Sequence, residues 1–354
     1  MKTEIVCPIP SSDAEKNPRN SEGSFIHLKD GRIAFYYTRY YGDSFHDHAT
    51  ADIVVRYSSD NGESWSDFET VIKGPENGNV MSVSLLRLQD GRIMMMYLRK
   101  DKHTADACYD CRPTFIFSSD EGVTWTEPET IADIPVYFVG NNDRLVQLSS
   151  GRILYPVAFH NWINSGGIVF VYYSDDNGKS WRPSSWILPP ADQEDKCTGL
   201  QEPGVIELDD GSVMCWHRTN YHCQWKCFSS DGGVNWTCVE PAEEFPSNLA
   251  PMQIKRNPYT KEYVAVWNDT SVERWQIEPD YSNWASSRNR LVVAFSSDCK
   301  NWHGHETLEF DRDAGFCYPA MEFTDDGGIL LAYCCGGHGK ICLQDLCIRK
   351  IKSC

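Results

Sequence analysis

The chain has no long hydrophobic run and carries little basic charge for its length. None of its apolar stretches approaches the ~18 residues that a membrane-spanning helix needs. Lysine and arginine number 33 against 50 aspartate and glutamate, so the formal net charge is −17 at pH 7. Such a surface repels polyanions, which argues against nucleic acid or an anionic membrane as a partner. Residues 1–8 are too few and too polar for a secretory signal, so we expect a cytoplasmic protein.

Cysteine, in contrast, is abundant, with 15 residues in 354. The odd count, and the adjacent pair Cys334 and Cys335, favour reduced, buried thiols over a disulfide framework. Two groups have metal-ligand spacing: Cys108 and Cys111 with His103, and Cys223 and Cys227 with His222. Neither is accompanied by the second pair that a four-coordinate zinc site needs, so we expect no metal and no cofactor.

The most informative feature that the chain does have is a repeated motif. Four copies read Ser-(Ser or Asp)-Asp-X-Gly-X-(Ser, Thr or Asn)-Trp, and a fifth is one residue shorter and lacks the glycine. The copies occupy residues 58–65, 118–125, 174–181, 229–236 and 296–302. Their tryptophans lie 60, 56, 55 and 66 residues apart, which is the period of an array of similar units. Serine and aspartate can hydrogen-bond nearby backbone and glycine can take positive φ, so each copy predicts a tight hairpin turn.

A second repeat, out of phase with the first, sets the number of units. A turn of the type Leu-X-Asp-Gly-Arg-Ile recurs at residues 28–33, 88–93, 148–153, 208–213 and, loosely, 324–329; residues 257–262 fill the remaining gap. Runs of β-forming residues follow these turns, so each unit reads as four strands. Six such units predict an all-β, six-bladed β-propeller that folds as a single domain over residues 1–354. We expect a strand near residues 4–9 to close the last blade by pairing with a C-terminal strand. A β-sandwich explains the period poorly.

The repeat also locates the side chains nearest the propeller axis. Six residues before each aligned turn stand polar side chains: Glu22, Ser82, Asn142, Glu202 and Tyr318. Three residues before each turn stand apolar ones: Phe25, Leu85, Leu145, Val205 and Met321. Because strand residues alternate in direction, the apolar set should pack between blades and the polar set should frame one mouth of the channel.

The repeated motif resembles the Asp box of sialidase-like propellers, and further segments resemble sialidases in the same order along the chain. Residues 201–211, followed by Arg218, are similar to the stretch that holds a catalytic glutamate and a downstream arginine. Residues 315–320 are similar to the stretch with the tyrosine nucleophile. Asp47 precedes the first Asp box, where sialidases place their acid/base aspartate, and Arg288 precedes the last one, where the final arginine of their carboxylate-binding triad lies.

This resemblance implies an exo-glycoside hydrolase for terminal sialic acid or a related acidic sugar. Glu202 would take the proton of Tyr318, whose attack would give a covalent glycosyl-enzyme. A neutral tyrosine suits a substrate whose anomeric carbon already carries a carboxylate, because that group would repel an anionic nucleophile. Asp47 would protonate the departing oxygen and later activate water. Arg218 and Arg288 would hold the substrate carboxylate through paired, charge-assisted hydrogen bonds.

The first arginine motif of the sialidases, Arg-Ile-Pro, is absent. Alignment from the following turn puts Ser21 in its place, with Arg19 two residues away and Glu22 facing the site. A carboxylate there would repel an anionic sugar unless a cation such as Arg39 or Arg144 pairs with it. The expected substrate-binding residues are Arg19, Glu22, Arg39, His48, Asn142, Arg144, Arg218 and Arg288.

Three alternatives stay open at this point. A one-residue shift would make His48 the acid/base in place of Asp47. A uronic-acid lyase or another carbohydrate-active propeller could use His48, His160 or Tyr318 as base and acid. A noncatalytic glycan-binding propeller would rely on aromatic platforms. The distance between the Glu202 carboxylate and the Tyr318 hydroxyl separates these hypotheses, because the sialidase chemistry requires hydrogen-bond contact between them.

Overall fold

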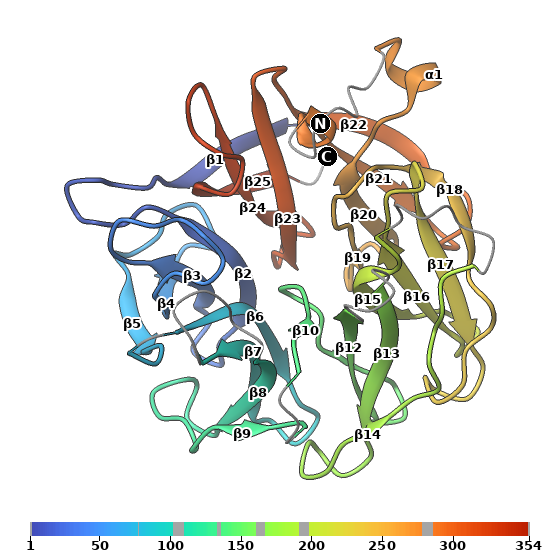
Figure 1. Ribbon diagram of the computed structural model, residues 1–354, viewed down its shortest axis with the longest axis horizontal. Coiled ribbons are helices and arrows are strands. Elements are labelled where there is room, and N and C mark those ends of the chain that lie inside the picture. The colour runs from blue at the N-terminus through green and yellow to red at the C-terminus, as the bar shows by residue number, and fades with distance from the viewer. Residues whose placement is uncertain are drawn as a thin grey trace.

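The computed structural model describes residues 2–76, 78–101, 110–132, 136–160, 167–190, 198–277 and 286–352. Apart from the short helix α1 (Val272–Trp275) and a single 3-10 turn at Ser286–Arg288, these residues form strands and connecting turns. The sheets stand side by side in a ring around a central axis (Figure 1). The fold is therefore an all-β propeller. Within the described ranges no helix is long and apolar enough to cross a membrane.

The strands of the described ranges form five hydrogen-bonded sheets. The largest contains β2 (Asn20–His27), β3 (Ile33–Tyr40), β4 (Ala51–Ser58), β5 (Glu69–Ile72), β6 (Asn79–Arg87), β7 (Ile93–Lys100), β8 (Cys111–Ser118) and β9 (Glu129–Thr130). The next contains β10 (Phe138–Val139), β11 (Val146–Gln147), β12 (Ile153–His160), β13 (Gly167–Ser174) and β14 (Arg182–Pro183). Two further sheets contain β15 (Gln201–Glu207), β16 (Val213–Arg218), β17 (Cys223–Ser229) and β18 (Glu240–Pro246), and β19 (Gln253–Arg256), β20 (Tyr263–Asn268), β21 (Arg290–Ser296) and β22 (His303–Phe310).

The expectation of six separate four-stranded sheets is wrong at the level of hydrogen bonding. The first sheet has eight strands because Ala51 of β4 pairs in parallel with Asn79 of β6. This one residue pair joins two antiparallel four-stranded units, β2 to β5 and β6 to β9. The sheet of β10 to β14 has five strands because β10 and β11 both pair with β12, where a single innermost strand was expected.

The fifth sheet joins the two ends of the described chain. β1 (Lys2–Ile9) pairs antiparallel with β25 (Asp345–Lys352), β25 pairs with β24 (Ile329–Gly337), and β24 pairs with β23 (Ala314–Phe323). The predicted closure of the last blade by an N-terminal strand is thus confirmed. This pairing places the N- and C-terminal segments next to each other in the ring (Figure 1).

The hairpin turns predicted from the first motif form, and the four copies that contain its glycine place it against the neighbouring unit. In the first turn the Asp60 carboxylate accepts hydrogen bonds from the backbone and hydroxyl of Ser64, and Ser58 donates to it at 2.8 Å. Gly62 has φ +85°, and a Cβ there would meet the Leu330 side chain at 2.6 Å. Glycine is therefore required both by the left-handed backbone and by the close approach of another blade.

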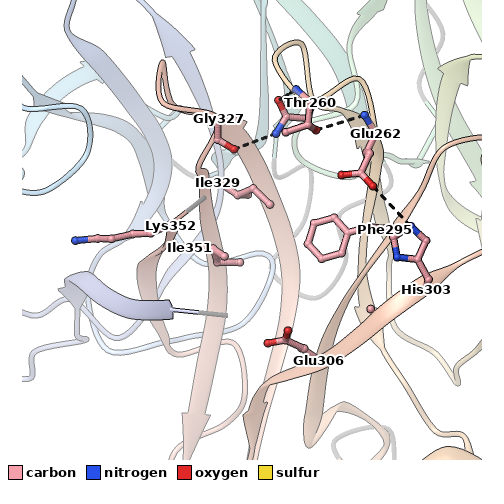
Figure 2. Close-up of a pocket in the computed structure, with 11 residues that line it drawn as sticks. Thr260, Glu262, Phe295, His303, Glu306, Gly327, Ile329, Ile351 and Lys352 are labelled. Atoms are coloured by element: carbon pink, nitrogen blue, oxygen red, sulfur yellow. Dashed lines mark hydrogen bonds and ion pairs between the residues drawn. The ribbon is translucent and has the colours of Figure 1, made fainter. Parts of the chain in front are cut away.

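A cavity of about 320 Å³ lies between the sheet of β19 to β22 and the sheet that contains β23 to β25. Phe295, Ile329 and Ile351 form its apolar wall, and Glu262 and Glu306 lie at its edge (Figure 2). The cavity is at the turn end of β23, near Gly327. It contains none of the polar residues expected at the mouth of the channel.

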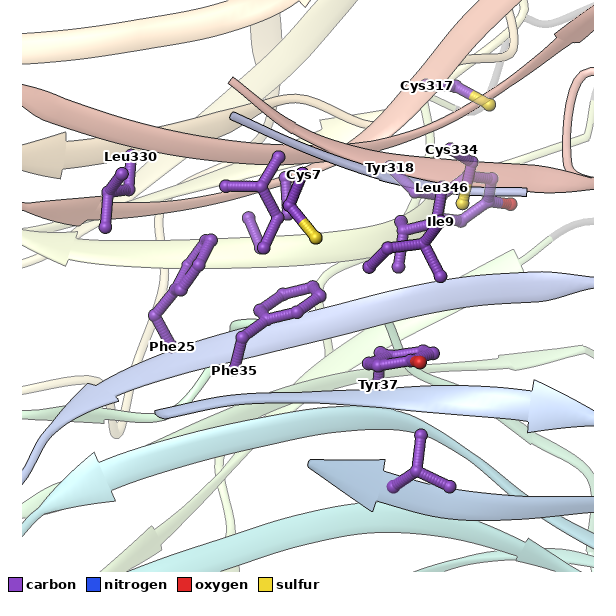
Figure 3. Packing of buried hydrophobic residues seen from close by; sticks show 14 of the residues in the cluster. Cys7, Ile9, Phe25, Phe35, Tyr37, Cys317, Tyr318, Leu330, Cys334 and Leu346 are labelled. Atoms are coloured by element: carbon purple, nitrogen blue, oxygen red, sulfur yellow. The ribbon is translucent and has the colours of Figure 1, made fainter. Parts of the chain in front are cut away.

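The core lies between neighbouring sheets, with one cluster for each pair of packed faces. Between the first and last sheets, Phe25 and Phe35 pack on Leu330 and Cys7 (Figure 3). The apolar positions predicted from the repeat are all buried, as expected: Phe25, Leu85, Leu145, Val205 and Met321. The twelve cysteines of the described ranges are free thiols, and most are buried in these clusters.

Candidate active site

The innermost strands carry a ring of residues with left-handed backbone. Glu22, Ser82, Glu202 and Tyr318 have φ of 48°, 56°, 40° and 57°, and each lies at a register shift in its strand. Non-glycine residues rarely adopt this conformation, which costs of order 1–3 kcal/mol and persists where the surrounding structure enforces it. Such residues gather at functional sites. All four belong to the polar ring that the repeat predicted.

Two further residues complete the ring and differ from the sequence prediction. Asp143, with φ 58°, takes the place expected for Asn142 in the segment between β10 and β11. Leu249, with φ 49°, lies before β19, in the unit whose altered turn gave no alignment. Met252 lies three residues later and is buried, like the apolar residue that follows Glu22 by three positions, so this spacing would have identified Leu249. A β-bulge re-aims a side chain out of the regular alternation, and here the bulges bring residues of different sheets together.

The central contact of the site joins two of these bulged residues. The Tyr318 hydroxyl donates a 2.8 Å hydrogen bond to Glu202 Oε1. Arg218, at the end of β16, places Nη1 2.7 Å from the other carboxylate oxygen of Glu202 and 3.4 Å from the Tyr318 hydroxyl. Burial, and then the charge of Glu202, raise the pKa of Tyr318 well above its usual value, against the effect of the nearby arginines. The phenol is therefore neutral at rest and directs its proton at a carboxylate base.

Arg288 lies on the other side of Tyr318. Its guanidinium carbon is 5.3 Å from the centre of the Tyr318 ring, and Nη2 donates to the Leu249 carbonyl at 2.7 Å. Burial alone would lower the pKa of Arg288, but Cys317 and Tyr318 raise it by more, so the side chain stays charged. Two cations, Arg218 and Arg288, thus flank the tyrosine.

A second charged group forms around Arg19, a residue that is only 1% exposed. Arg19 Nη1 lies 2.5 Å from Asp47 Oδ1, and Nη2 lies 3.3 Å from Glu22 Oε1 and 3.0 Å from the Ser21 hydroxyl. The other oxygen of Glu22 accepts a hydrogen bond from the Ser82 hydroxyl. Burial nevertheless raises the pKa of Glu22, because Arg19 and Ser82 offset only part of the desolvation. The cation that pairs with Glu22 is therefore Arg19.

Asp47 belongs to the segment between β3 and β4, and its backbone is held in place. The Asp47 carbonyl accepts hydrogen bonds from Lys100 Nζ at 2.9 Å and from the Asn79 amide at 2.8 Å. Its side chain is 55% exposed. Partial burial raises the pKa of Asp47, but the charges of Arg19 and Lys100 outweigh it and lower the value to about 2. The next residue, His48, is exposed, and its ring contacts the edge of Tyr137.

Three predicted substrate-binding residues lie outside this group and have other partners. Arg39 pairs with Glu15 at 2.9 Å and stacks on the Tyr41 and Phe68 rings, so it does not neutralise Glu22. Arg144 is buried and donates to Gln253 Oε1 at 2.8 Å and to the Met252 carbonyl at 2.7 Å. Asn142 is buried and donates to the Gly23 carbonyl at 2.8 Å. Arg144 and Asn142 brace the innermost strands against one another.

Asp143 has a similar bracing role that the sequence did not reveal. Its carboxylate accepts hydrogen bonds from Ser24, Gln253 and Lys255 at 2.7 to 2.9 Å, and from the Met321 backbone at 3.0 Å. Burial raises the pKa of Asp143, but Lys255 and these hydrogen bonds lower it by more. Asp143 thereby ties several innermost strands together.

The described residues contain one group with metal-ligand chemistry, and it is not one of the two groups with ligand spacing that were rejected from the sequence. Cys215, His217 and Cys227 are buried on one face of β16 and β17, with Cys227 Sγ 3.5 Å from His217 Nε2. Hydrogen bonds from Cys215 and His217 outweigh burial and lower the pKa of the Cys227 thiol to about 6. Cys215 and His217 are two residues apart, which is the spacing that places side chains on one strand face. The group with His103 and Cys108, and the proposed role of His160, lie outside the residues whose side chains the structure describes.

Comparisons with known proteins match this architecture. Residues 46–331 match the family model of the BNR repeat-like domain. A sialidase of Paraclostridium sordellii is 27% identical over 237 residues, which are 60% of this chain and 56% of that protein. The anhydrosialidase of Macrobdella decora is 27% identical over 137 residues, 36% of this chain and 16% of that protein. The chain thus spans little more than half of the first relative and a small part of the second.

Solved structures with the same fold include two that cover almost the whole chain. A protein of unknown function from Dyadobacter fermentans has a TM-score of 0.76 at 18% identity and covers 99% of both chains. The intramolecular trans-sialidase of Ruminococcus gnavus, in complex with oseltamivir carboxylate, has a TM-score of 0.69 at 14% identity and covers 97% of this chain and 96% of its own. Since the family model spans most of its length, this chain belongs to the BNR repeat-like domain family, and it has the same fold as these solved structures.

Proposed function

We propose that the protein is an exo-acting glycoside hydrolase of the sialidase type, which releases a terminal sialic acid or a related acidic sugar. The observation that carries this proposal is the 2.8 Å hydrogen bond from the Tyr318 hydroxyl to Glu202. A buried tyrosine without such a partner packs against apolar side chains or donates a hydrogen bond from its hydroxyl to a backbone carbonyl. A tyrosine held in left-handed backbone against a carboxylate, between two arginines, has the arrangement of a nucleophile with its base.

In the proposed reaction, Glu202 accepts the phenolic proton as the Tyr318 oxygen attacks the anomeric carbon. The bond to the departing oxygen breaks as Asp47 donates a proton to it, which leaves the sugar bound covalently to Tyr318 as an aryl glycoside. Water, deprotonated by Asp47, then attacks the same carbon, and Glu202 returns the proton to Tyr318. Two inversions give net retention of configuration at the anomeric carbon.

The three arginines support an anionic substrate. Arg218 and Arg288 flank Tyr318, and Arg19 lies in the adjoining group with Asp47 and Glu22. We propose that these guanidinium groups together bind the substrate carboxylate, with Arg19 as the first of the three although it stands two residues from the aligned position. Paired hydrogen bonds from guanidinium forks are the strongest neutral-pH contacts that a protein offers to a carboxylate.

We also propose that the ring counts six blades. Dividing the eight-stranded sheet at the single pair Ala51–Asn79 gives two four-stranded units in addition to the other four sheets. Six innermost segments carry one left-handed residue each, which supports this division. An experimental density map that shows one continuous blade for β2 to β9 would contradict it.

Hydrolysis of a fluorogenic N-acetylneuraminic acid glycoside tests the function. The wild type should release the fluorophore, and Tyr318→Phe and Glu202→Gln should each lower kcat by roughly 10³-fold or more while remaining folded. Tyr259→Phe is the matched control, because Tyr259 is half exposed in a turn and contacts Asp325. Release that persists in both site variants would contradict the mechanism. If the wild type cleaves only uronic or neutral glycosides in a parallel panel, the sialic-acid assignment is wrong.

A further inference from the structure

The ion pair between Arg19 and Asp47 is incompatible with the roles proposed for both residues, the binding of the substrate carboxylate and the donation of a proton. Arg19 is a proposed ligand of the substrate carboxylate, yet its side chain is 1% exposed. The Asp47 carboxylate lies 2.5 Å from Nη1, and the Phe45 carbonyl lies 3.3 Å from the same nitrogen. Asp47 is itself 55% exposed, so it lies between Arg19 and solvent. In the resting enzyme a carboxylate of the protein occupies the place that the substrate carboxylate would need.

The same contact holds Asp47 in the wrong protonation state for its role. A general acid works best with a pKa near the working pH. Arg19 and Lys100 keep the pKa of Asp47 near 2, so Asp47 is ionised at every physiological pH and has no proton to donate. The charged and titratable groups that face it are Arg19, Lys100, His48, Glu22, Tyr40 and Tyr137.

We propose that the substrate carboxylate displaces Asp47 from Arg19, and that this exchange both opens the carboxylate site and prepares Asp47 as the acid. The inference rests on the proposed function. Once a substrate carboxylate neutralises Arg19, Asp47 loses its cation and gains an anionic neighbour, and both changes favour its protonated form. The proton comes from solvent, so binding takes up as much as one proton. No covalent bond changes in this step.

The structure favours a movement confined to the side chain. The Asp47 carbonyl is fixed by Lys100 and Asn79, so rotation about χ1 can release the carboxylate while the backbone stays in place. Arg19 is held independently, since it also contacts Ser21 and Glu22 and lies 4.7 Å from the centre of the Tyr40 ring. The guanidinium therefore keeps its position when Asp47 leaves.

Calorimetric binding of 2-deoxy-2,3-didehydro-N-acetylneuraminic acid tests the exchange without any turnover. Measured near pH 6 in buffers of different ionisation enthalpy, the wild type should take up more protons on binding than Asp47→Asn, by as much as one, because any uptake by Glu22 is common to both. Asp47→Asn should also bind about tenfold more tightly, if Arg19 is unmasked in roughly a tenth of the wild-type molecules. Asp43→Asn is the control, because Asp43 lies in the same segment and pairs with Lys16, so it should behave as wild type. The methyl ester of the ligand lacks the negative charge, so its affinity should not increase with Asp47→Asn.

The outcomes separate the two proposals. Binding by wild type and Asp47→Asn with equal affinity and equal proton uptake would overturn the exchange and leave the hydrolase proposal standing. Weaker binding by Asp47→Asn would also overturn it, because Asp47 would then support the carboxylate site. Failure of the wild type and both variants to bind would overturn the proposed function and the exchange with it.

Discussion

Tyr318 of β23 and Glu202 of β15 meet across two sheets, with the hydroxyl 2.8 Å from Glu202 Oε1. Both residues are the left-handed residue of a β-bulge, and both stand at the same position of the repeat. The same local backbone feature, a left-handed residue at a β-bulge, therefore brings both side chains of the pair together from different sheets. The chemistry then depends on which side chains the ring carries, and on the arginines that flank them.

Arg218→Lys should damage both binding and chemistry. Lysine keeps the charge but loses the planar fork, and Arg218 contacts Glu202 as well as the Tyr318 hydroxyl. We expect KM for the acidic glycoside to rise and kcat/KM to fall by roughly 10- to 100-fold, about 1.4–2.7 kcal/mol of transition-state stabilisation. Steady-state kinetics checks this. Lys226, near Arg218 in sequence, pairs with Glu244, and Lys226→Arg should leave kcat/KM unchanged.

Glu22→Gln should stabilise the fold at neutral pH. The pKa of Glu22 is raised in the folded protein, so the folded state binds this proton more tightly than the unfolded chain. Its contribution to stability is complete below the unfolded pKa and declines as pH rises through the folded pKa. Thermal melts should therefore give Glu22→Gln a higher Tm than wild type at pH 7, with the difference vanishing near pH 4. A lower Tm at pH 7 would show that the ion pair with Arg19 outweighs desolvation.

Gly204→Ala should destabilise the site-bearing strand. A Cβ at Gly204 would lie 2.2 Å from the indole ring of Trp216, which is 1% exposed and donates to the Met252 carbonyl. The ring has no room to move, so we expect a loss of roughly 1–3 kcal/mol in the free energy of unfolding. Urea unfolding measures it, with Val123→Ala, an exposed substitution, as the neutral control. Equal midpoints for wild type and Gly204→Ala would contradict the packing described for this strand.

The Asp-box turns should make the protein sensitive to acid. Hydrogen bonds from Ser64 and Ser180 hold the pKa of Asp60 and Asp176 at about 2. Because these folded pKa values are depressed, the stabilisation is present above the unfolded value near 4 and is lost as pH falls to about 2. Asp60→Asn should lower Tm at pH 6 and flatten its decline below pH 4. Asp67→Asn, at an exposed position close to that turn, should leave the pH profile of Tm unchanged.

Counting along the repeat placed much of the site because each blade uses the same turn and the same bulge. The positions of Glu22, Ser82, Glu202 and Tyr318 follow from that count, and all four have left-handed backbone. The count fails at Asn142, where the innermost strand is broken between β10 and β11 and the next residue takes the role.

Arg19 and Asp47 could not be assigned in this way, for two physical reasons. A bulge between Ser21 and Ser24 shifts the register of β2. The long Arg19 side chain contacts Ser21, the residue that alignment put in the place of the first arginine. Asp47 lies in a connecting segment outside the repeat, where its place is set by Lys100 and Asn79 of other strands. The contacts of Arg39 with Glu15 and of Arg144 with Gln253 join residues that are distant in sequence, so no local pattern encodes them.

The central claim, that Tyr318 is the nucleophile, is tested most directly by trapping the covalent intermediate. A sialic acid with fluorine as the leaving group at C2 and a second fluorine at C3 should react once and hydrolyse slowly, because the C3 fluorine destabilises the positively charged transition state. Peptide mass spectrometry should then find one fluorosialyl group on Tyr318 in the wild type and none in Tyr318→Phe. A label on any other residue, or release of the sugar without a trapped adduct from an enzyme that turns over the glycoside, would contradict the account.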